Sequence, residues 1–184
     1  MRKENKRQLL IDAAYKVFAK KGYKNASIKD IAKEAEITPG LVHYYFKSKE
    51  ELLLEVQEHV QRRYQKQYEG RKPQELSMKE TLNEIKSRAE EDPDWYRLRY
   101  ELYGLGLKNE SIQHEVRSLL KSGRDSLAIP MQQVRGKKGD EEQLASILLA
   151  CFDGLALQKI MDDTFDLDEA YGVLNQLMEN YLKE

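Results

Sequence analysis

Three closely spaced helix starts between Ser27 and Glu51 constrain this chain more than any other feature. Ser27 is a favourable N-cap residue, and Asp30, three positions later, completes the pattern of a capping box. Thr38 is a second N-cap candidate, and Pro39 follows it at the first helical position, where the missing N–H costs nothing. The sequence therefore predicts one helix after Ser27 and another after Thr38.

The third start follows almost immediately. Ser48 and Glu51 have the spacing of a full capping box, which opens a longer helix at Lys49. Only Glu36 and Ile37 separate the first helix from the second cap, and so short a turn makes two short helices cross steeply. This pattern predicts a helix-turn-helix.

The second of these helices has the composition of a contact surface. Val42, Tyr45 and Phe46 can face inward, which leaves a nearly uncharged outer face. Such residues suit the major groove of DNA, where an apolar side chain contacts a thymine methyl and polar groups reach base edges or phosphates. The alternative is a small three-helix packing unit with an irregular surface. The outer face comprises Pro39, Gly40, Leu41, His43 and Tyr44.

Residues 9–53 resemble the N-terminal domain of the tetracycline-repressor (TetR) family of bacterial regulators. The resemblance lies in LLIDAAYKVFAKKGYKNASIKDIAKEAEITPG followed by LVHYYFKSKEELL, and it runs without a gap. It implies a DNA-binding head and a helical body that binds a ligand and dimerises. Leu41 and His43 stand where the family often has Thr and Tyr, so the operator preference of the family is not carried over.

The charge of the chain is unevenly distributed. Residues 1–49 hold twelve Lys or Arg against five Asp or Glu, a balance of +7, whereas residues 50–184 hold nineteen against twenty-seven, a balance of −8. Together they leave a formal net charge of −1. A basic head on an acidic body fits a protein that presents one end to phosphates, although charge runs are also common on solvated faces.

Composition indicates a soluble helical protein. Hydrophobic residues make up 40% and charged residues 34% of the 184 residues, a balance that excludes a disordered chain. We identified no apolar run long enough to cross a membrane, no signal-peptide core, and a single cysteine, Cys151, which excludes an internal disulfide framework. We therefore expect a cytoplasmic protein with no membrane partner.

The helix signals predict an all-α protein with a three-helix DNA-binding domain and a C-terminal helical bundle. The boundaries are 1–48 for the helix-turn-helix domain, 49–72 for a connector helix and linker, and 73–184 for the ligand-binding and dimerisation domain. The first helix should end at Lys21 before Gly22, and Pro130 should kink or interrupt its helix. Further helix starts are expected at Ser77, Asp94, Asn109, Asp140 and Asp166.

We predict DNA contacts by ten residues of the head. The hydroxyl and the N–H groups at a helix N-terminus suit an anion at Ser27, and the two tyrosines offer hydroxyls beside the groove. The role of Lys49 is implied by the resemblance, because this lysine commonly contacts the DNA backbone in TetR-like proteins. The predicted set is Ser27, Lys29, Thr38, Pro39, Gly40, Leu41, His43, Tyr44, Tyr45 and Lys49.

No catalytic or metal-binding pattern was found, so we expect no enzyme activity, no metal and no cofactor. The three histidines are far apart in sequence, and a single cysteine gives no metal-site spacing. The resemblance implies instead a cavity for a small hydrophobic or cationic inducer, while aromatic residues at helical spacing also fit a plain core. The candidate lining is Trp95, Tyr96, Arg99, Tyr100, Tyr103, His114, Met131, Phe152 and Met161.

The last two predicted helices each carry a wide apolar sector. One side of such a sector can pack in its own core and the other against a second copy, and TetR-like proteins dimerise through two C-terminal helices per subunit. A terminal hairpin packed only on its own chain is the alternative. The predicted interface comprises Leu144, Leu148, Cys151, Leu155, Leu167, Leu174, Leu177, Met178 and Tyr181.

Together these features predict a homodimeric transcriptional regulator. We expect a repressor that binds palindromic double-stranded operator DNA and is released by a small-molecule inducer. The alternative is a helical ligand-binding or scaffold protein whose head no longer recognises a defined operator.

Overall fold

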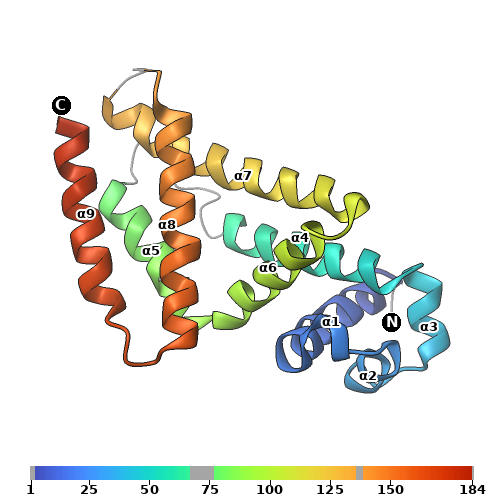
Figure 1. Ribbon diagram of the computed structural model, residues 1–184. Coiled ribbons are helices and arrows are strands. Elements are labelled where there is room, and N and C mark those ends of the chain that lie inside the picture. Colours follow the sequence, from blue (N-terminus) through green and yellow to red (C-terminus); the bar gives the residue numbers. More distant parts are fainter. Residues whose placement is uncertain (1–2, 67–76, 136–138, 184) are drawn as a thin grey trace. The chain divides into compact units, whose positions relative to one another are not determined.

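A computed structural model describes residues 3–66, 77–135 and 139–183, and every regular element in these ranges is an α-helix, as the sequence predicted (Figure 1). The capping boxes and apolar stripes of the sequence account for most of the helix boundaries. The helices are α1 (Lys3–Asn25), α2 (Ile28–Glu34), α3 (Pro39–Tyr45), α4 (Lys49–Lys66), α5 (Met78–Glu91), α6 (Pro93–Gly106), α7 (Glu110–Arg135), α8 (Glu141–Met161) and α9 (Leu167–Lys183).

The described helices form two compact units. The head unit comprises α1–α4 together with residues 97–115, and the body unit comprises α5, α8, α9 and the remaining parts of α6 and α7. Helix α4 therefore belongs to the head unit by its packing, because it contacts α1. The three-part division at residues 48 and 72 remains a prediction.

Helix α1 is the centre of the head unit, where it contacts both α2 and α4. Its apolar stripe is buried, including Leu10, Ala14 and Phe18. We predicted that the helix ends before Gly22, but it does not. Gly22 breaks the helical backbone with φ 72° and ψ 156°, and a further turn continues to Asn25. Glycine adopts this left-handed φ without the penalty that a Cβ imposes.

The body unit is built around α5, which contacts both α8 and α9. Its buried residues recur at helical spacing, namely Met78, Leu82, Ile85 and Ala89. Helix α8 contributes Leu144, Ala145, Leu148, Phe152 and Ala156 to this core, and α9 contributes Leu167, Tyr171 and Met178. Burial of these side chains stabilises the unit by the hydrophobic effect, at about 25 cal/mol per Å² of apolar surface.

One predicted helix start in the body was wrong, and one expected interruption of a helix does not occur. Helix α6 begins at Pro93, and the N–H of Trp95 donates to the carbonyl of Asp92 (3.1 Å), so Asp94 lies inside the first turn rather than at the cap. Proline at the first helical position explains this start. Helix α7 continues through Pro130 to Arg135, so the expected interruption does not occur, while a kink at this proline stays a prediction.

The other predicted starts of body helices are confirmed, with one difference in detail. Ser77 forms a complete capping box with Glu80, and Asp166 accepts from the N–H of Glu169 (2.8 Å). Asp140 occupies the N-cap position of α8, but its side chain makes no capping hydrogen bond. Its carboxylate accepts instead from the Tyr181 hydroxyl (2.6 Å), which links the start of α8 to the end of α9.

Helix α8 is more apolar than the sequence inspection suggested. By length and composition it is the one helix among the described residues that could cross a membrane, and only 28% of its most apolar window is buried. Because α8 also packs in a helical core with α5 and α9, its exposed apolar side chains instead suggest a surface that another protein chain covers.

Candidate nucleic-acid interface

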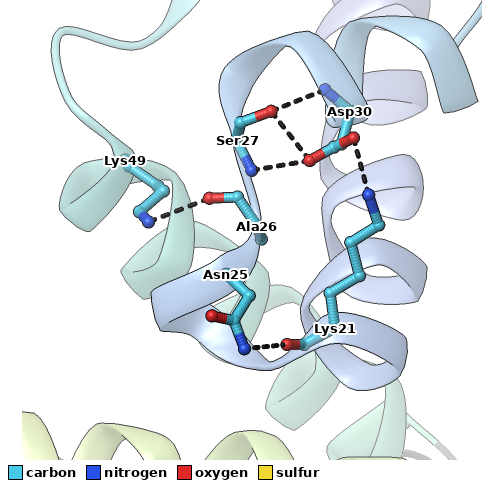
Figure 2. A network of polar contacts seen from close by, with 6 residues as sticks. All are labelled: Lys21, Asn25, Ala26, Ser27, Asp30 and Lys49. Carbon is cyan, nitrogen blue, oxygen red and sulfur yellow. Dashed lines mark hydrogen bonds and ion pairs between the residues drawn. The ribbon is translucent and has the colours of Figure 1, made fainter.

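The start of α2 is held by a network of hydrogen bonds (Figure 2). The Ser27 hydroxyl accepts from the Asp30 N–H (3.1 Å), and the Asp30 carboxylate accepts from the Ser27 N–H (3.0 Å). Lys21 extends from α1 and donates to the other oxygen of Asp30 (2.6 Å). These bonds, with that from Lys21 the strongest, hold the pKa of Asp30 well below its ordinary value. The predicted capping box is confirmed, and it fastens α2 to α1.

This network changes the expected role of Ser27. Its N–H and its hydroxyl both donate to Asp30, the hydroxyl at 2.7 Å. A phosphate that approached the start of α2 would meet the Asp30 carboxylate, which already accepts hydrogen bonds from both Ser27 donors. Neighbouring Lys29 is exposed and carries the positive charge on the outer side of α2. Lys29 is therefore better placed than Ser27 to attract a DNA backbone.

The turn between α2 and α3 depends on an unusual backbone conformation at Glu36. This residue has φ 54°, the one positive φ of a non-glycine residue in the described ranges. The conformation lets the Ile37 N–H donate to the Ala32 carbonyl (2.9 Å), while the Glu36 N–H donates to the Lys33 carbonyl (3.2 Å). These bonds close the end of α2 in the manner of a Schellman cap. The left-handed residue was not predicted, because Glu seldom occupies it.

Helix α3 presents the outer face that its sequence predicts. Val42 and Phe46 are buried, with exposed fractions of 0% and 1%. Leu41 is half-buried, so its side chain is only partly available to a partner. The residues that remain exposed are Thr38, Pro39, Gly40, His43 and Tyr44. None of these carries a permanent charge, which makes the face unlike an ordinary solvated helix surface.

The two tyrosines of α3 have different environments. Tyr44 is 66% exposed, one of the most exposed large side chains of the head unit. Tyr45 is half-buried, and its ring meets that of Tyr44 edge-on, with the centroids 5.1 Å apart. This T-shaped pair orients the Tyr44 ring before any partner binds. Tyr44 is therefore the stronger candidate for contact with DNA.

Lys49 is held inside the head unit. Its ammonium donates to the carbonyls of Tyr23 (2.8 Å) and Ala26 (2.9 Å), and it lies 4.3 Å from the centre of the Tyr23 ring. The two carbonyls belong to the last turn of α1 and the loop after it, where a cation complements the unpaired acceptors of a helix end. The ammonium joins α4 to α1, so a phosphate would have to compete with these internal acceptors.

Tyr23 is the functional residue that the sequence inspection missed. Its ring lies under Lys49, and its hydroxyl donates to Glu50 (2.6 Å), so it connects the end of α1 to two consecutive residues of α4. Burial and this hydrogen bond raise the pKa of Tyr23, while the same bond lowers that of Glu50. The signal was present in the FAKKGY segment, where one aromatic residue follows the glycine that breaks the helix.

The cap at the start of α4 differs slightly from the predicted full capping box. The Glu51 N–H donates to the Ser48 hydroxyl (3.0 Å), as expected. The Glu51 carboxylate, however, accepts from the N–H of Lys47 (2.7 Å), one residue before the cap. Both bonds still satisfy donors around the helix start, so the function of the motif is kept.

The predicted ligand-lining residues are divided between the two units. Trp95, Tyr96, Met131 and Phe152 are buried in the body unit, and Arg99 is buried in the head unit with Tyr100 and Tyr103 half-buried nearby on α6. His114 and Met161 are exposed, the latter by 77%, so neither lies in a core. A ligand role for all nine residues remains a prediction.

The predicted dimer residues also divide into two groups. Leu144, Leu148, Leu167 and Met178 lie in the core of their own chain, where they are not available to a second copy. Leu177 and Tyr181 are exposed, by 62% and 41%, while Cys151, Leu155 and Leu174 are half-buried. The exposed side also includes residues that were not predicted, namely Ile147, Leu157, Met161 and Val173.

The head of the chain is similar in sequence to known regulators. Residues 10–56 match the sequence model of the family described as bacterial regulatory proteins, tetR family. The HTH-type transcriptional regulator YuxN of Bacillus subtilis (strain 168) is 49% identical over 51 residues, which are 28% of this chain. The match spans only 18% of that relative's own length.

The whole chain is similar in fold to solved regulators. Salmonella enterica GusR superposes with a TM-score of 0.81 at 22% identity, covering 100% of this chain and 98% of that one. A transcriptional regulator from Saccharomonospora viridis, solved in complex with choline, gives 0.79 at 21% identity over 96% and 97% of the two chains. Residues 10–56 therefore have the sequence pattern of bacterial regulatory proteins of the tetR family, and the whole chain shares its fold with solved regulators.

Proposed function

We propose that this protein is a transcriptional repressor that binds a palindromic operator as a homodimer and leaves it when a small hydrophobic or cationic inducer binds. The observation that carries the proposal is the outer face of α3, which is exposed yet uncharged. A rigid helix-turn-helix supports this face through the Ser27–Asp30 cap and the Lys49 contacts. Each α3 would lie in a major groove, with its first residues nearest the bases.

A dimer is needed because one α3 contacts too few base pairs to specify an operator. The exposed apolar side chains on α8 and α9 support a dimer that forms through these two helices. They follow helical spacing on each helix, so they form two stripes that a second copy can cover. The proposed stripes are Ile147, Leu157 and Met161 on α8 and Val173, Leu177 and Tyr181 on α9.

Release from DNA requires that a ligand bind the two states of the dimer with different affinity. Helices α6 and α7 each continue from one unit into the other, α6 between Tyr96 and Arg97 and α7 between Glu115 and Val116. A shift of either helix in the body is therefore carried along the chain into the head. This continuity supports coupling between the inducer and the spacing of the two α3 helices.

The proposal is tested by selecting DNA from a random pool with the full-length protein and titrating the selected sequence at several salt concentrations. We expect a palindromic motif with half-sites about one helical turn, 34–36 Å, apart. A steep salt dependence without any motif would indicate nonspecific phosphate binding and contradict the proposal. The setting we propose is the cytoplasm, and the proposal includes no catalytic step.

A further inference from the structure

The C-terminal end of α3 is contacted by a residue of α1. The guanidinium carbon of Arg7 lies 5.1 Å from the centre of the Phe46 ring, and Phe46 is the residue at which α3 ends. This ring is almost completely buried. A guanidinium over an aromatic ring is attracted by the negative charge density of the ring face. Arg7 therefore connects the start of α1 to the end of the helix that presents the outer face.

The same guanidinium is paired with a carboxylate of α4. Nη2 of Arg7 lies 2.5 Å from Oε1 of Glu55, and both side chains are partly buried. An exposed ion pair alone contributes little to stability, because water and salt screen it. This pair has a further consequence, since it holds the guanidinium at the Phe46 ring. Arg7 thus joins α1, the end of α3 and α4 through one planar group.

Helix α3 depends on such contacts for its direction. It has seven residues, about two turns, and a helix this short gains little stability from its own hydrogen bonds. Its main helix contact is with α2. Directly after Phe46, the Lys47 N–H donates to the carboxylate of Glu51 (2.7 Å), which precedes Glu55 by about one turn of α4. Two neighbouring carboxylates of α4 therefore hold the end of α3, one through the backbone and one through Arg7.

We propose that Arg7 is a positioning residue for DNA recognition, which fixes the direction of α3 from its C-terminal end and does not itself contact DNA. A basic residue near the start of α1 suits a phosphate contact by its residue type. A phosphate, however, would have to draw the guanidinium away from both the Phe46 ring and Glu55, and it would meet the negative charge of Glu55. The inference deepens the proposed function and rests on it for the role of α3 in recognition.

The first measurement is hydrogen exchange, detected by mass spectrometry, on the full-length protein without DNA. Arg7→Met and Glu55→Met each remove one member of the ion pair. In both variants we expect the amides of residues 41–47 to exchange at least about fivefold faster, while those of residues 31–35 in α2 stay within about twofold of wild type. Lys16→Met removes the cation of an exposed ion pair between α1 and α2, so it is the matched control and should leave residues 41–47 unchanged.

The second measurement is affinity for the selected operator and for a scrambled sequence, by fluorescence anisotropy at several salt concentrations. Arg7→Met and Glu55→Met should each weaken operator binding about fivefold, with nonspecific binding within about twofold of wild type and an unchanged slope of log K against log salt concentration. A misdirected α3 loses base contacts, whereas nonspecific binding depends on phosphates. The double variant should bind about as well as the weaker single variant, because both residues act through one contact.

Two results would overturn the inference. If Arg7→Met lowers the salt slope by about one unit and Glu55→Met tightens binding, Arg7 contacts a phosphate that Glu55 repels. If neither variant changes exchange in α3, or if operator affinity stays at the wild-type value, the pair is an ordinary surface ion pair. Thermal unfolding checks that each variant is folded at the assay temperature.

Failure of the proposed function gives a different result. Wild-type protein would then select no DNA motif, while hydrogen exchange of the free protein would still decide whether Arg7 fixes α3. The failure of the positioning role and the failure of operator recognition are therefore distinguishable.

Discussion

The ammonium of Lys49 donates to the carbonyl of Ala26 at 2.9 Å, and this contact joins the start of α4 to the loop between α1 and α2 (Figure 2). The same ammonium donates to the backbone carbonyl of Tyr23 and lies over the Tyr23 ring. The three contacts close the head unit around the helix-turn-helix. Lys49 therefore supports the DNA-binding surface from inside, whether or not it also meets a phosphate.

Replacing Lys49 should destabilise the head. Lys49→Met keeps much of the apolar length of the side chain but leaves two carbonyls without their charged donor. Because hydrogen bonds to charged groups contribute about 1.5–3 kcal/mol, we expect the free energy of unfolding to fall by roughly 1–3 kcal/mol, measured by urea denaturation. Exposed Lys29→Met is the matched control and should change stability by less than about 0.5 kcal/mol. Equal stability of the two variants would contradict the internal role of Lys49.

Replacing Tyr44 should weaken operator binding and leave stability unchanged, the reverse of the effect on stability expected at Lys49. Tyr44→Ala removes an exposed ring from the outer face of α3, so the fold should be unaffected. We expect operator affinity to fall by about tenfold, or about 1.4 kcal/mol, which lies within the roughly 1–3 kcal/mol expected for one good base contact. Fluorescence anisotropy with the selected operator measures this loss. An unchanged affinity would exclude Tyr44 from the contact surface.

Glu36 is a site where a substitution should stabilise the protein. Its φ of 54° is unfavourable for a residue with a Cβ and natural for glycine. Glu36→Gly should raise the free energy of unfolding by about 0.5–1 kcal/mol. Glu36→Ala keeps the Cβ and serves as the control, for which no gain is expected. A loss of stability in the glycine variant would contradict the strained backbone conformation.

The Asp30 network should make stability depend on acid pH. The folded-state pKa of Asp30 lies below its ordinary value of 3.8, so its contribution is present above that value and is lost as pH falls below it. Urea midpoints measured from pH 6 downwards should decline less steeply below about pH 4 for Asp30→Asn than for wild type. Asp163→Asn, in an exposed loop, is the control. Parallel declines in the Asp30 variant and wild type would refute the assignment.

The proposed dimer gives a fifth prediction. Leu177→Glu places a charge in the exposed apolar stripe of α9, where burial against a second copy would then leave it unpaired. Light scattering should show a shift from dimer to monomer at micromolar protein concentration. Gln176→Glu, on the solvent side of the same helix, should remain dimeric. If Leu177→Glu also remains dimeric, this stripe is not the interface.

Sequence patterns alone were sufficient for much of the local helical structure of both units. Capping signals at Ser27 and Ser77 specify helix starts because their hydrogen bonds join residues three apart, and apolar spacing identifies the buried side of α3 through Val42 and Phe46. At Asp140 the start of α8 was predicted correctly, but its carboxylate accepts from Tyr181 of another helix instead of capping its own helix.

Only the tertiary structure determined which of several suitable partners a side chain contacts. Lys49 could have met a phosphate by its residue type, yet it donates to carbonyls of residues 23 and 26 that the fold brings beside it. Leu144 and Leu177 have equal hydrophobicity, but packing buries the first and leaves the second exposed. The physical reason is that hydrogen bonds within one helical turn are encoded by spacing, whereas contacts between distant segments depend on how the packed helices meet.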